Sequence, residues 1–164
     1  SQNRLWSPDT PEADNPAKSL GSAMQASCPV LVGAEFLAGN LHVMRNQICE
    51  TSKNFACYLE LPDLNHFAME GLAYPEANPS NLVFVFFESM LYSGRVQQRL
   101  DLTKEVVIKN GINSLAYSLE ADTRLGQALE CLQFGAWLSY YLGISKGIDT
   151  VRIPGVDWFK ENLK

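Results

Sequence analysis

Long hydrophobic runs are missing from the sequence. The longest uninterrupted apolar stretch covers residues 82–87, whereas a helix that crosses a bilayer needs roughly 20 apolar residues. The N-terminal region also lacks the apolar centre of a secretory signal peptide. We therefore expect a soluble protein that does not bind a membrane.

Charge is also scarce, and the balance is acidic. Charged residues make up 19% of the chain, and the formal net charge at pH 7 is −5. A large basic face cannot form, so nucleic acid and anionic lipid are poor candidates as partners. A small pocket that neutralises an anionic ligand is still compatible with this composition.

The sequence has few residues that bind metals. Four cysteines, at positions 28, 49, 57 and 131, form no CxxC pair and lie in apolar segments. We interpret them as small core residues of a protein in the reducing cytoplasm. Of the two histidines, His42 lacks the partner four residues away that helical metal sites often use. We expect no metal site.

The length of 164 residues and the hydrophobic content of 46% are typical of one domain with a sizeable core. Residues 1–14 precede the first helical pattern, and their start contains a lone Trp6 close to a proline. We interpret this segment as a linker or as an arm that lies on another surface. The folded domain is expected to cover residues 15–164.

Apolar patterns predict strands that alternate with helices along this domain. Strands are expected at residues 28–34, 55–60, 81–89 and 112–120, and helices at 16–27, 35–53, 95–111, 122–147 and near the C-terminus. This alternation predicts an α/β fold in which a parallel sheet of four to five strands lies between two layers of helices. Residues 122–147 are so apolar that their helix should be packed on most of its circumference.

Two residues stand out, and each also has a simpler explanation. His66 lies in a loop after the second strand, where ligands of such sheets bind. Its imidazole could act as a general acid or base, or it is only a surface histidine. Glu50 lies in the last turn of a predicted helix, where the helix dipole disfavours a carboxylate. It is either a reactive group or a solvated glutamate paired with Lys53.

Other candidates carry weaker signals. Lys160 in the terminal helix has the pattern of a surface lysine. Three aromatic residues of the long helix, at positions 137, 140 and 141, are interpreted as core or dimer contacts. Ser89, Ser93 and Gly94 follow a strand and could cradle a phosphate. Their signal is weak because the sequence contains no glycine-rich phosphate fingerprint.

Four segments taken together resemble a known family. They are RNQICETSK, ELPDLNHFAMEG with His66 16 residues after Glu50, CLQFGAWLSYYLGISKGID, and the terminal WFKENL. In this order they resemble the C-terminal half of the bifunctional phosphoglucose/phosphomannose isomerases, which are sugar isomerase (SIS) domain proteins. The resemblance runs from Asn15 to Leu163.

The resemblance implies a flavodoxin-like SIS domain, used twice per polypeptide, and a homodimer. It also implies aldose–ketose interconversion of hexose 6-phosphates without metal or cofactor. By matched motif, Glu50 is similar to the base that moves a proton between C1 and C2 through a cis-enediol. His66 is similar to a residue that assists ring opening and comes from the neighbouring subunit, and Lys160 to one that contacts the sugar or assists ring opening.

Two departures from the family pattern affect this interpretation. Ala136 stands in GAW where the family usually has GDW, a change at the support of the site or at the subunit contact. The first SIS domain, with its phosphate-binding loop and an active-site arginine, is absent from the sequence. We predict an isomerase half that is incomplete without an N-terminal SIS half. The alternative is a non-catalytic SIS module for sugar-phosphate binding, dimerisation or regulation.

Overall fold

The computed structural model describes residues 5–163 and contains one parallel sheet with the strand order β2-β1-β3-β4. The strands are β1 (Cys28–Ala34), β2 (Cys57–Leu61), β3 (Leu82–Glu88) and β4 (Asn113–Ser118). All four expected strands therefore form. The chain passes from the inner strand β1 to the edge strand β2. It then crosses to β3 on the other side of β1 and continues to β4, so the sheet is doubly wound.

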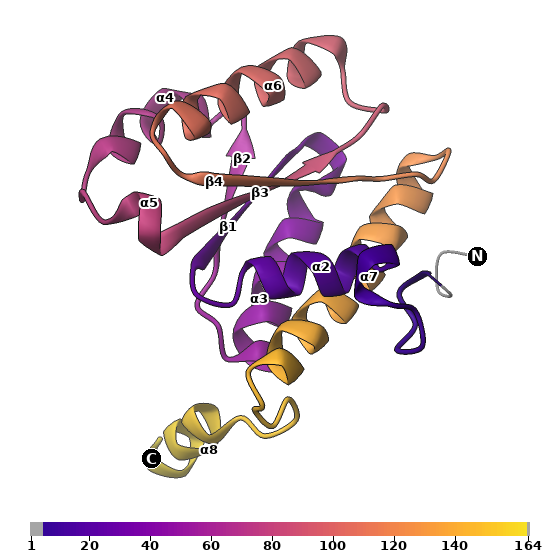
Figure 1. Cartoon of the computed structure of the whole chain (residues 1–164), viewed down its shortest axis with the longest axis vertical. Coiled ribbons are helices and arrows are strands. Elements are labelled where there is room, and N and C mark those ends of the chain that lie inside the picture. The colour runs from indigo at the N-terminus through magenta and orange to yellow at the C-terminus, as the bar shows by residue number, and fades with distance from the viewer. Residues whose placement is uncertain (1–4, 164) are drawn as a thin grey trace.

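Helices cover both faces of the sheet and give the expected three-layer α/β/α architecture (Figure 1). One layer contains α2 (Pro16–Ala23), α3 (Ala38–Ser52) and α7 (Arg124–Ser145), and the other contains α4 (Leu64–Phe67) and α6 (Gly94–Lys109). The short elements are η1 (Glu12–Asp14), η2 (Glu35–Leu37), η3 (Glu70–Ala73) and α5 (Asn78–Asn81). The last helix, α8 (Pro154–Asn162), extends away from the body of the domain.

Local sequence signals set several helix ends. The side-chain oxygen of Asn15 accepts hydrogen bonds from the backbone N–H groups of Ala17 and Lys18 at 3.1 and 3.2 Å, which caps α2. Gly111 adopts φ +73° after α6, and its N–H donates to the carbonyl of Ile108 at 2.9 Å. Both signals were readable in the sequence.

Two segments differ from the expectation. The helix expected from residue 35 begins as η2, and regular α-helix starts only at Ala38, because Glu35 adopts φ +50° and turns the chain first. The segment between β2 and β3, interpreted as a loop, contains α4, η3 and α5. These elements have only four residues each, too few to show a helical period.

The main core lies between the sheet and α7. Phe134 is fully buried, and its ring stacks on Tyr117 with centroids 3.7 Å apart. Trp6 is also buried and meets Phe134 edge-on, while the Tyr141 hydroxyl donates to the Trp6 carbonyl at 2.5 Å. The N-terminal segment from residue 5 therefore lies against α7 of its own chain.

Some surface features also follow from this packing. Cys131 lies in the core, whereas the other three cysteines are half-buried, and all four are free. No helix within residues 5–163 is both long and apolar enough to cross a membrane. The long helix α7 is packed on most of its circumference, as expected, and one stripe of it is exposed.

Candidate functional site

Glu50 lies in the last turn of α3, and its side chain is exposed. The Lys53 ammonium donates to the backbone carbonyl of Glu50 at 2.6 Å. Among residues 5–163 the Glu50 carboxylate has neither an ion pair nor a hydrogen bond. Lys53 therefore contacts the backbone of Glu50 and leaves the carboxylate able to act on a ligand.

A cavity of about 320 Å³ lies between the end of α3 and the start of α8. Glu50 and Lys53 line one side, and Ile153, Pro154 and Val156 line the other. The second side is apolar, so a ligand held here would bring the carboxylate into a less hydrated environment. Desolvation of this kind favours a carboxylate as a base.

Lys160 belongs to the same terminal helix. It lies in the last turn of α8 with its side chain exposed. Six residues separate it from Pro154, which at the helical rise corresponds to ~9 Å along the axis. The structure thus brings Glu50 next to the start of α8 and places Lys160 farther along that helix.

His66 lies in α4, just beyond the carboxyl end of β2, and its side chain is exposed. Its neighbour Asn65 fixes this short helix to α6. The Asn65 amide donates to the Thr103 hydroxyl at 2.9 Å, and its oxygen accepts from the Arg99 guanidinium at 3.1 Å. Asn65 is therefore a positioning residue for His66, a role that sequence reasoning missed because Thr103 and Arg99 are distant in the chain.

Glu50 and His66 lie near opposite ends of strand β2 within one chain. Helix α3 returns the chain from the carboxyl end of β1 to the amino end of β2, so Glu50 lies before β2 and His66 lies after it. The five residues of β2 span ~16 Å. A single chain does not bring these two side chains together.

Ser89 and Ser93, the weak candidates for a phosphate cradle, already form hydrogen bonds within the chain. The Ser89 hydroxyl donates to Gln127 at 2.5 Å and accepts from the Leu91 N–H at 2.9 Å. The Ser93 N–H, at the start of α6, donates to the carboxylate of Glu35 at 3.0 Å. The Glu35 carboxylate of the same chain thus occupies the N-terminus of α6, the position where an anionic ligand could otherwise bind.

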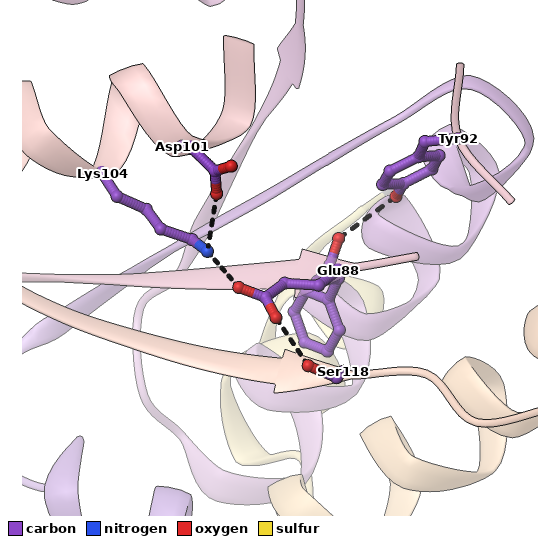
Figure 2. Close-up of polar contacts among 6 residues, drawn as sticks. Glu88, Tyr92, Asp101, Lys104 and Ser118 are labelled. Atoms are coloured by element: carbon purple, nitrogen blue, oxygen red, sulfur yellow. Dashed lines mark hydrogen bonds and ion pairs between the residues drawn. The ribbon is translucent and has the colours of Figure 1, made fainter. Parts of the chain in front are cut away.

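A second cavity, of about 210 Å³, lies at the carboxyl ends of β3 and β4, where Glu88, Asp101 and Ser118 contribute to its lining. Figure 2 shows that the Glu88 carboxylate accepts from Lys104 and from Ser118. Burial alone would raise the pKa of Glu88, but these hydrogen bonds and the Lys104 charge together hold that pKa below its usual value. Acidic side chains in the lining disfavour a phosphate in this cavity.

The described residues were also checked for a group that could bind a metal ion. No three His, Cys, Asp or Glu side chains in the described part of the chain are grouped so that they could hold one. His42 instead stacks on Tyr58, with ring centroids 5.5 Å apart.

A doubly wound parallel sheet between two helical layers defines a three-layer α/β domain. The chain belongs to the family of bacterial phospho-glucose isomerase C-terminal SIS domains, whose model matches residues 13–163. This agrees with the family resemblance found in the sequence.

Individual relatives are similar over only part of their own length. The bifunctional phosphoglucose/phosphomannose isomerase of Aquifex aeolicus (strain VF5) is 25% identical over 147 residues, which cover 90% of this chain and 46% of the relative. A glucose-6-phosphate isomerase like protein from Thermus thermophilus shares the fold, with a TM-score of 0.77, 20% identity and coverage of 91% of this chain and 50% of that one. The chain thus spans about half the length of these relatives.

A more distant solved structure has the same fold. Glucosamine-6-phosphate deaminase from Thermotoga maritima matches with a TM-score of 0.56 and 15% identity, over 84% of this chain and 42% of that one. At this identity the likeness concerns architecture alone.

Proposed function

We propose that this chain is the C-terminal SIS half of a phosphoglucose/phosphomannose isomerase. Its substrates would be glucose 6-phosphate or mannose 6-phosphate, converted to fructose 6-phosphate. The observation that carries the proposal is the cavity between α3 and α8, in which Glu50 lies opposite an apolar wall. Membership of the family supplies the reaction class.

In the proposed reaction Glu50 is the base. Its carboxylate removes the proton from C2 of the open-chain aldose while O1 takes up a proton, which gives a cis-enediol. It then returns the proton to C1 as the O2 hydroxyl gives up its proton, which leaves the ketose. The chemistry needs a positioned and partly desolvated carboxylate, and it uses no metal or cofactor. Lys160 on α8 contacts the sugar or assists ring opening beside this base.

His66 assists ring opening from a neighbouring subunit in this proposal. The separation of His66 from Glu50 within one chain supports that arrangement, because His66 of the same chain lies beyond the far end of β2 from the Glu50 cavity. A homodimer is therefore part of the proposed function, and the Asn65 contacts with α6 would hold His66 in place for it.

The phosphate group of the substrate would be bound elsewhere. Since Ser89 and the N-terminus of α6 are engaged by Gln127 and Glu35, an N-terminal SIS half is proposed to supply the anchor. In this arrangement residues 15–164 form the SIS domain and residues 1–14 its arm. The free cysteines fit the reducing cytoplasm as the compartment.

An isomerase assay with fructose 6-phosphate tests the proposal. The chain alone should be nearly inactive, whereas the chain assembled with an N-terminal SIS half of the family should be active. Glu50→Gln should lower kcat of the assembly by about 10²–10⁴-fold, the usual contribution of a general base. Glu105→Gln, on the exposed face of α6, is the matched control and should leave kcat unchanged.

The alternative is a non-catalytic SIS module. It is favoured by Ala136 in place of the family acid and by the occupied phosphate cradle. An assembly that forms but neither isomerises fructose 6-phosphate nor responds to Glu50→Gln would reject the isomerase and support the module.

A further inference from the structure

Two of the four free cysteines lie beside each other at the amino ends of neighbouring strands. Cys28 is the first residue of β1, and Cys57 is the first residue of β2. Val30 is the register partner of Cys57, and side chains two residues apart in a strand point to the same face. The thiols of Cys28 and Cys57 therefore share one face of the sheet, and both residues are half-buried. We call these two residues the thiol pair.

Hydrogen bonds of the preceding residues hold the two strand starts in place. The amide of Asn54 donates to the carbonyl of Ser27 at 3.0 Å, directly before Cys28. The thiol of Cys49, in α3, donates to the carbonyl of Ala56 at 3.9 Å. Each member of the thiol pair thus follows a residue whose backbone carbonyl is bound by a side chain of the same chain.

The two thiols form a hydrogen bond in which Cys57 donates to the sulfur of Cys28. This bond stabilises a thiolate on Cys28 and, against the opposing effect of burial, lowers the pKa of Cys28 from the ordinary 9.0 to about 7. The same bond, together with burial, raises the pKa of Cys57. The thiol pair therefore releases one proton near neutral pH and keeps the second, as two acids that share a proton do.

The neighbouring elements differ in what they present to the thiol pair. From α3, the Cys49 thiol raises the pKa of Cys57 and the Arg45 charge lowers it, both after the larger effects of Cys28 and of burial. From β3, Leu82 is the register partner of Cys28 and is apolar. The thiolate on Cys28 thus depends mainly on the donor in Cys57. Reactive cysteines typically lie in such partly exposed sites that stabilise the thiolate.

We propose that the thiol pair is a modification site at which the thiolate of Cys28 attacks a small-molecule disulfide such as glutathione disulfide. A bond forms between the Cys28 sulfur and one sulfur of the reagent, while the sulfur–sulfur bond of the reagent breaks. The electron pair of the broken bond leaves with the second sulfur, which takes up the proton that the thiol pair released. The products are a mixed disulfide on Cys28 and one small-molecule thiol, and an excess of that thiol reverses the exchange.

A direct disulfide within the thiol pair does not fit the register of the strands. Cys28 lies two residues before the partner of Cys57, which puts their Cα atoms ~8 Å apart at the usual strand spacing and rise. Cysteines whose Cα atoms are more than about 7 Å apart cannot be bridged unless the backbone moves. Cys57 therefore supplies a hydrogen bond to the thiolate, and the second sulfur of the new bond comes from the reagent.

The test follows the reaction of the full chain with glutathione disulfide by mass spectrometry, over a series of pH values. Peptide mapping locates the modified cysteine. The wild-type chain should gain one glutathione, on Cys28, and the rate should have its midpoint near pH 7. Cys57→Ala removes the donor and should move the midpoint up toward the ordinary value of 9.0. Cys57→Ser keeps a hydroxyl donor and should bring the midpoint back down.

The rate at pH 7 gives the size of the effect. Without the donor in Cys57 the thiolate fraction of Cys28 should fall ~50-fold, as the pKa returns from about 7 to 9.0. A less acidic thiol is a stronger nucleophile, which offsets most of this loss. Cys57→Ala should therefore slow the modification of Cys28 at pH 7 about fivefold.

Cys49→Ser is the matched control, because Cys49 is also half-buried but bonds to a backbone carbonyl. It should leave the midpoint and rate at Cys28 unchanged. Cys131 is an internal reference, since burial raises its pKa to about 12 and it should stay unmodified. Circular dichroism verifies that each variant is folded.

Several results would overturn the proposal. They are a wild-type chain that does not react, a midpoint that Cys57→Ala does not move, and a first modification on Cys49 or Cys131. An intrachain disulfide between Cys28 and Cys57 would overturn it as well. The inference goes beyond the proposed function and does not depend on it. Because the test reads the mass added to a cysteine rather than isomerase activity, either proposal can fail without the other.

Discussion

The helices α6 and α7 cover opposite faces of the same sheet, yet their outer surfaces differ. The exposed face of α6 presents Arg95, Asp101, Glu105 and Lys109 around its apolar side chains. The exposed face of α7 has no charge after its first residue. Both helices bury an inner face, so burial does not distinguish them. Charge on the outer face does: the outer face of α6 is charged, as solvated helix faces usually are, whereas the outer face of α7 is exposed but almost uncharged.

The largest loss of stability is expected from a substitution on the inner face of α7. Phe134→Ala removes a fully buried ring that contacts Tyr117, Phe87 and Trp6. We expect it to lower the free energy of unfolding by about 3–5 kcal/mol. Urea denaturation followed by circular dichroism measures the change.

The matched variant in α6 is Val107→Ala, at a position that is also fully buried. It removes fewer atoms and should cost about 2 kcal/mol. Equal losses at the two positions would contradict the view that the α7 layer holds the main core.

A smaller effect is expected where α6 meets the sheet. Lys104→Met removes the ammonium group that contacts Glu88 and lies 3.5 Å from Asp101. Because the folded protein lowers the pKa of Glu88, this carboxyl contributes stability above its unfolded pKa and loses that contribution as pH falls through the folded pKa.

Lys104→Met should therefore cost up to about 1 kcal/mol near neutral pH, and the difference from wild type should shrink in the acid range, below the ordinary carboxyl pKa of 4.5. Unfolding free energies measured at a series of pH values test this. A difference that grows as the pH falls would contradict the assigned role of Lys104.

The smallest effect is expected on the charged outer face of α6. Lys109 and Glu105 form an exposed pair with a separation of 3.5 Å. Lys109→Met should change the unfolding free energy by less than about 0.5 kcal/mol, and added salt should remove the difference. A loss comparable to that of Phe134→Ala would show that this face is not simply solvated.

Much of the architecture could be predicted from the sequence because its signals are local. The apolar run 28–34 and the strand β1 have the same bounds, and Asn15 with Pro16 marks the start of α2. The family motifs pointed to Glu50, His66 and Lys160 from the sequence alone, and the catalytic roles of these residues stay predictions. The Asn65 contacts with Thr103 and Arg99 could not be predicted, since no local pattern records them.

The outer face of α7 illustrates the limit of local reasoning. Its apolar composition predicted packing on most of the circumference, but the sequence cannot say which side is covered by the same chain. That is decided by how α2, α3 and the sheet pack against α7, which leaves one face of this helix exposed, with Leu125, Leu129, Leu132, Tyr140 and Ile144 on it.

The sequence by itself determined the four strands, the longer helices, their order and the family, because hydrophobic periods, helix caps and short motifs act over a few residues. Only the tertiary structure decided which residues meet. It set Glu50 and His66 near opposite ends of β2, because parallel strands require each helix to carry the chain back across the domain. It also placed Glu50 at the same cavity as the start of α8, which comes more than a hundred residues later in the chain.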